Sequence, residues 1–187
     1  MHKYLVSCAF LFLLTTTWNN KAFCQEFKQY QYEEMLEYYA QSFLMNEVYQ
    51  INSNGYDSLY IDKLITEWDQ HEGFAFTFIA YSFNDKIGMI ISSSRTAYPT
   101  GLEYTIIHLP NDEVLKLRKI IIEISSSKQK ENYAKRLNRL NERIIVESTF
   151  VNNERAIVIW IDGHNRHSIT LGKWERAYKR YEKFVNP

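Results

Sequence analysis

Hydrophobic residues follow two different periods along this chain. Over residues 30–46, and again over residues 57–68, they recur at the spacing of an amphipathic helix. After residue 73 the pattern changes to short aromatic and β-branched runs separated by turn residues, which is typical of strands. The sequence therefore predicts a helical N-terminal segment over residues 25–72, followed by a sheet.

The strand-like runs fall into two groups of the same order, each followed by a helical pattern. The first group occupies residues 73–124 and the second residues 143–187, and a polar helix is expected to link them within residues 125–142. Ile120 and Ile122 leave a strand open as an alternative to the helix of the first group. The expected strands are residues 74–83, 86–94, 101–109, 143–151, 155–161 and 166–171, and the expected helices after them are residues 113–124 and 173–185.

This order predicts an α+β fold, in which an antiparallel β-sheet is built from two β-β-β-α halves with additional N-terminal and linking helices. An internal duplication would account for the repeated order, and so would chance, because a meander followed by a helix is common. Residues 25–187 are expected to form a single domain, since a chain of about 160 residues buries roughly 70% of its unfolded surface.

The first 24 residues have the three parts of a secretory signal. Lys3 gives a basic start, residues 4–14 are an apolar run, and Ala22 lies close to the expected cleavage site before Gln25. The apolar run is shorter than the roughly 20 residues that cross a bilayer. We therefore expect an exported protein, periplasmic or secreted, whose mature chain has no transmembrane segment.

Two alternatives to simple cleavage remain open. One is a lipid anchor at Cys24, which would tether the protein to the envelope. Lipidation favours an aliphatic residue three positions before the cysteine and a small residue directly before it, whereas this chain has Lys21 and Phe23. The other alternative is an uncleaved membrane anchor.

Removal of the signal changes both the thiol content and the charge. Cys8 and Cys24 are the two cysteines of the chain, so the mature part holds no disulfide and depends on packing. Loss of Lys3 and Lys21, with no acid lost, takes the net charge from 0 to −2. This balance gives no electrostatic reason to expect a nucleic-acid partner.

Catalytic motifs are absent from the sequence. It contains no G-x-S-x-G and no H-E-x-x-H pattern, and the mature part has no cysteine for thiol chemistry or cysteine-bound zinc. We therefore expect no catalytic residue set, metal site or cofactor.

Histidines and acids form the one tempting cluster. Asp162, His164 and His167 are close in sequence, but on the expected strand His164 and His167 would point to opposite sides. His108 lies in an apolar run and is expected to be a hydrogen-bonded core histidine. A small exported hydrolase with a non-sequential site, built from these histidines and nearby acids, remains the alternative function.

Two surfaces favour binding over catalysis. The loop over residues 95–101 presents Arg95 and Tyr98 beside turn residues, and loops on rigid sheets often carry binding sites. The closing helix is basic, which suits an acidic partner or lipid headgroups; its candidate residues are Lys173, Arg176, Lys179 and Arg180. The sequence therefore predicts an exported, non-enzymatic binding protein of the bacterial envelope that contacts a protein or an envelope component. An immunity-type inhibitor of a secreted toxin is one form of this hypothesis.

Overall fold

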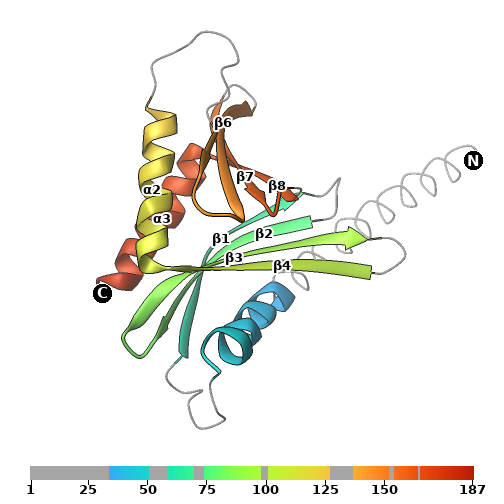
Figure 1. The fold of residues 1–187 in the computed structure, drawn as a ribbon, viewed down its shortest axis with the longest axis vertical. Coiled ribbons are helices and arrows are strands. Elements are labelled where there is room, and N and C mark those ends of the chain that lie inside the picture. The colour runs from blue at the N-terminus through green and yellow to red at the C-terminus, as the bar shows by residue number, and fades with distance from the viewer. Residues whose placement is uncertain are drawn as a thin grey trace, which may run out of the picture.

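Two four-stranded antiparallel sheets form the framework of the protein (Figure 1). The computed structural model describes residues 34–50, 59–69, 74–97, 101–126, 137–151, 154–163 and 165–187. The first sheet has the strand order β1-β2-β3-β4 and the second has the order β5-β6-β7-β8. Antiparallel sheets combined with helices confirm the predicted α+β fold.

Each sheet is a meander whose last strand leads directly into a helix. The first half consists of β1 (Leu59–Asp69), β2 (Phe74–Phe83), β3 (Lys86–Ala97), β4 (Gly101–Pro110) and α2 (Asn111–Ser125). The second half consists of β5 (Leu137–Arg139), β6 (Ile144–Val151), β7 (Glu154–Ile161), β8 (Asn165–Thr170) and α3 (Leu171–Val185). Before them, residues 34–43 are α-helical and continue as a π-helical turn, η1 (Leu44–Val48). The helix predicted over residues 113–124 is thus confirmed as α2.

The helix predicted over residues 57–68 is wrong, because residues 59–69 form strand β1. A β-bulge explains the misleading pattern. The register of β1 against β2 skips between Lys63 and Ile65, and Leu64 and Ile65 consequently both pack into the same core cluster. Leu64 and Ile65, with Ile61 before them and Trp68 after them, therefore have the spacing of an apolar helix face although they lie in a strand.

The predicted linking helix is wrong at its C-terminal end. Residues 127–136 lie outside the described part of the chain, but residues 137–139 form β5 and pair with β6. The turn between these strands is set by Asn141, whose side-chain oxygen accepts the backbone N–H groups of Arg143 and Ile144, both at 2.9 Å. Each half is therefore β-β-β-β-α, not β-β-β-α. The shared order does not by itself confirm a duplication.

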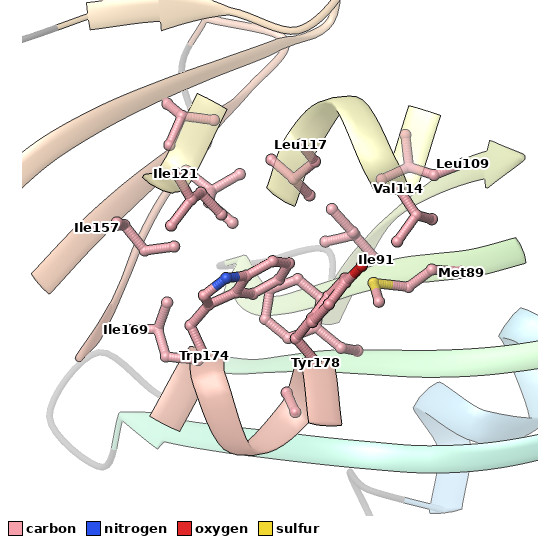
Figure 2. Close-up of a cluster of buried hydrophobic side chains, with 14 of the residues drawn as sticks. Met89, Ile91, Leu109, Val114, Leu117, Ile121, Ile157, Ile169, Trp174 and Tyr178 are labelled. Carbon is pink, nitrogen blue, oxygen red and sulfur yellow. The ribbon is translucent and has the colours of Figure 1, made fainter. Parts of the chain in front are cut away.

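Side chains from α2 and α3 fill the space between the two sheets. Figure 2 shows Trp174 and Tyr178 of α3 opposite Leu117 of α2, with residues of the second sheet on one side and of the first sheet on the other. Trp174 is fully buried, and its ring centroid lies 5.4 Å from that of Phe78 on β2. The buried positions recur at helical spacing; they are Val114, Leu117, Ile121 and Ile124 on α2 and Trp174, Ala177, Tyr178 and Tyr181 on α3.

Polar contacts also hold the two helices together. Arg118 of α2 forms an ion pair with Glu175 of α3, and its guanidinium lies 4.6 Å from the centre of the Tyr178 ring. The Tyr181 hydroxyl donates to the side-chain oxygen of Asn111 at 2.9 Å. The position of α3 is thus fixed relative to α2 as well as to the sheets.

The opposite face of the first sheet is covered by the N-terminal helix (Figure 1). Ala40, Leu44 and Met45 pack there against Ile79 and Tyr81 of β2 and Ile90 of β3. Phe78 and Ile91, their neighbours along these strands, point to the other core because side chains alternate in a strand. This double burial explains why residues 74–83 are apolar at nearly every position.

Gly88 on β3 provides a test of this packing. A Cβ atom there would lie within 3.0 Å of both the Leu109 carbonyl oxygen and the Tyr81 hydroxyl oxygen, so Gly88→Ala should lower the free energy of unfolding by about 1–3 kcal/mol. Urea denaturation measures the change. Gly172→Ala is the matched control, because nothing lies within 4 Å of a Cβ at that helical position. Equal stability of the two variants would contradict the predicted overlap.

Candidate functional site

A groove between the edge strand β1 and helix α3 is the candidate site. It has a volume of about 400 Å³ and is lined by Lys63, Leu64, Ile65, Thr66, Arg176 and Arg180. Three of these six residues are cations and none carries a carboxylate. The groove is therefore suited to an anionic group.

The β-bulge in β1 helps to position one wall of the groove. Leu64 lies outside the regular register with β2, and its carbonyl accepts a hydrogen bond from Nη1 of Arg180 at 2.8 Å. Nη2 of Arg180 lies 3.8 Å from Oδ1 of Asp62. Arg180 is thus bound to the strand at two points, which orients its guanidinium along the groove.

A second ion pair lies at the other end of the α3 surface that faces β1. Nζ of Lys173 lies 2.5 Å from Oε2 of Glu67, and both side chains are partly buried. Arg176 lies between Lys173 and Arg180 on α3 and is exposed. Within the described ranges, no acidic side chain forms an ion pair with Arg176.

The structure brings together part of the predicted basic surface. Lys173, Arg176 and Arg180 all lie beside β1, whereas Lys179 is exposed and does not line the groove. The predicted loop over residues 95–101 is shorter than expected, because residues 95–97 belong to β3 and residue 101 to β4. Arg95 is a strand residue whose side chain is not described, and Tyr98 lies outside the described residues.

Sequence reasoning missed the strand side of the groove. Lys63 lines it, and Asp62 and Glu67 provide the ion pairs at its two ends. The basic row on α3 could be read from helical spacing, but these three residues could not be assigned to it because residues 57–68 were expected to be helical. The alternation of Leu59 and Ile61 with the more polar Tyr60 and Asp62 is the one signal that would have pointed to a strand.

His108 lies in a hydrogen-bonded chain on the face of the first sheet that the N-terminal helix covers. The Tyr49 hydroxyl donates to the Tyr81 hydroxyl at 2.8 Å, and the Tyr81 oxygen lies 2.5 Å from Nε2 of His108. Burial lowers the pKa of His108 and raises the pKa of Tyr81. These directions favour a neutral imidazole that accepts a hydrogen bond from a neutral phenol.

His167 lies on the other side of the first sheet, between the two sheets. Its Nε2 is 2.7 Å from Oγ of Ser93, and its ring stacks on Phe76 with centroids 4.4 Å apart. Both His167 and Ser93 are 4% exposed, and burial lowers the pKa of His167 to about 4. An imidazole with this pKa is a weak general base, and the pair is almost closed to substrate. The contact therefore serves mainly to join the sheets.

The histidine–acid cluster that the alternative hydrolase function requires does not assemble among the described residues. Asp162 is bound by Arg143, with two nitrogen–oxygen distances of 2.8 Å, and His164 lies outside the described chain. No group of three His, Cys, Asp or Glu side chains in the described ranges could hold a metal ion. His108 and His167 lie on opposite faces of the first sheet.

Comparison of the chain with protein-family models, with curated proteins and with solved structures gave no match. Among the helices that the structure describes, none combines the length and the apolarity needed to cross a membrane. The geometry of the α3–β1 groove is therefore the main basis for a functional argument.

Acid should weaken the junction between the sheets through His167. Its pKa falls from the ordinary value of 6.5 to about 4 in the folded chain. The unfolded chain therefore binds the proton first as the pH falls, and the stabilisation present above pH 6.5 is lost between 6.5 and 4. We expect this residue alone to lower the free energy of unfolding by about 2 kcal/mol between pH 7 and pH 5.

Urea denaturation of His167→Gln at the two pH values tests this expectation. The variant cannot take up the proton, so its free energy of unfolding should fall by about 2 kcal/mol less than that of the original chain. His108→Gln keeps the contribution of His167 and removes only that of His108, whose pKa burial also lowers, so comparing the two variants separates the two shares. The same pH dependence in His167→Gln and the original chain would rule out the proposed role of this imidazole.

Proposed function

We propose that this chain is an exported, non-enzymatic binding protein of the bacterial envelope, and that it holds an acidic partner protein in the groove between β1 and α3. The observation that carries the proposal is the position of Arg176. Arg176 is exposed and lies between Lys173 and Arg180, which already have acidic partners. Lys63 lines the same groove. An anionic group from another molecule would give Arg176 the ion-pair partner that its two neighbours already have.

A protein partner fits the charge distribution better than a polyanion. Asp62 and Glu67 lie at the two ends of the basic row, and the mature chain expected from the sequence has a net charge of −2. An anionic membrane or a nucleic acid would meet these carboxylates together with the cations, and repulsion would offset much of the attraction. A partner that places one acidic side chain in the groove avoids both carboxylates.

The alternative of an exported hydrolase has less support. It requires histidines and a carboxylate in one cleft, whereas the two described histidines are separated by the first sheet. The close Ser93–His167 pair is buried and has a poorly basic imidazole. Binding without chemistry remains the better explanation of the groove.

Export rests on the N-terminal sequence and can be tested directly. Mass spectrometry of the protein purified from its native envelope or medium should give a chain that begins at Gln25, since cleavage is expected after the apolar run. A chain carrying an acylated Cys24 would replace this expectation with a lipid-anchored protein. Recovery of intact Met1 in a membrane fraction would indicate an uncleaved anchor.

Charge reversal at Arg176 tests the binding surface. Photo-crosslinking of the purified mature chain in an envelope extract should give a protein adduct whose yield falls by about tenfold with Arg176→Glu, because opposite charges become like charges. Lys179→Glu makes the same charge change on the same helix, outside the groove, and should leave the yield unchanged.

Two outcomes would contradict the proposal, the first in this experiment and the second in a parallel assay with lipid vesicles. One is an adduct that is equally sensitive to Arg176→Glu and Lys179→Glu, which would indicate general attraction by a basic helix. The other is binding to vesicles containing anionic phospholipid with no protein adduct, which would identify a lipid surface as the partner.

A further inference from the structure

Among the described residues, a row of ion pairs between α3 and β1 has no anion at its centre. The first cation, Lys173, meets Glu67, and the last, Arg180, meets Asp62. Helical rise places Arg176 about 4.5 Å along the axis from Lys173 and about 6 Å from Arg180. The facing positions of β1, residues 63–66, carry no carboxylate. The strand thus provides an acid at each end of the row and none at its centre.

We infer that the groove recognises one compact carboxylate, presented by a glutamate or aspartate side chain of the partner, and that this group takes the central place in the row. The inference rests on the proposed function and specifies its ligand chemistry. Arg176 is the residue that would bind the carboxylate directly.

The contacts of the cations indicate which of them can bind the ligand directly. Arg180 already donates to the Leu64 carbonyl and lies near Asp62, which limits its capacity for a ligand. Arg176 has no ion-pair partner in the described part of the chain, and its planar guanidinium can bind both oxygens of a carboxylate at once. Arg180 and Lys63 add positive potential around that bond.

The charges at the two ends of the row set the size and charge of the ligand. Asp62 and Glu67 lie beside the two outer cations, so an anionic group that extends beyond the centre would approach a carboxylate at either end. A phosphate is larger and carries oxygens in more directions, so with two of them on Arg176 a further one would approach Asp62 or Glu67, whereas a carboxylate has only the two oxygens that the guanidinium binds. A single carboxylate therefore matches the groove better than a phosphate or a chain of anions.

Nuclear magnetic resonance of the arginine Nε–Hε groups in the mature chain can test the inference with defined probes. The probes are the N-acetyl amides of glutamate, glutamine and phosphoserine, titrated at constant ionic strength with chloride as the balancing anion. We expect the glutamate probe to move the Arg176 resonance in a saturable way, and the neutral glutamine probe to leave it in place. The phosphoserine probe should bind more weakly than the glutamate probe.

Two substitutions separate bidentate recognition from simple attraction. Arg176→Lys keeps the charge and removes the planar fork, and it should weaken the glutamate probe by roughly threefold, as measured by backbone amide shifts of residues 63–66. Lys179→Gln, which removes a charge outside the groove, should leave the affinity unchanged.

The inference is overturned if glutamine or chloride reproduces the shift, if phosphoserine binds more tightly than glutamate, or if Arg176→Lys binds glutamate as well as the original chain. These results are distinct from a failure of the proposed function. A protein adduct that depends on Arg176, together with no response to the glutamate probe, would retain the partner surface and reject the single carboxylate.

Discussion

The shared burial of α2 and α3 is the constraint on which the rest of this structure depends. Each helix has one apolar stripe, and each stripe must cover part of both sheets at once. Trp174 meets this demand through its size, because it is fully buried and reaches Phe78 of the first sheet from a helix that also contacts the second. Replacing such a side chain by alanine typically costs about 3–5 kcal/mol. Once Trp174 and Tyr178 face inward, the opposite edge of α3 lies along β1, and its arginines border the groove.

How far the sequence predicts the fold depends on whether a pattern is local. The helices after each meander were predictable, because Val114, Leu117 and Ile121 recur on one face whatever they pack against. Strand β1 was not, since the bulge at Leu64 alters the alternation that identifies a strand. Strand β5 is three residues long and depends on a turn built by Asn141, so its pattern is too short to separate from a helix. Both errors concern strands that are identified by their pairing with the next strand, which the pattern within the segment itself does not show.

The candidate site, like the fold, could be predicted from the sequence only in part. The cations of α3 were predictable as a basic face because their spacing is helical, but that spacing alone did not separate Arg176 from Lys179. Only the packing of α3 against β1 shows that one faces the groove and the other does not. The histidines show the limit of reasoning from proximity in sequence. Asp162 is bound by Arg143, and His167 is directed to Ser93, 74 positions away. Contacts over such distances have no local pattern.

The bulge in β1 has a consequence for self-association. An edge strand offers a line of backbone groups with which a strand from another molecule can pair, and long regular edges are prone to aggregation. Here the register is broken at Leu64, and the carbonyl at that point is already bonded to Arg180. A foreign strand would have to displace this arginine and would find the ladder interrupted midway. The same bond that orients the groove thereby makes this edge a poor template for intermolecular sheet growth.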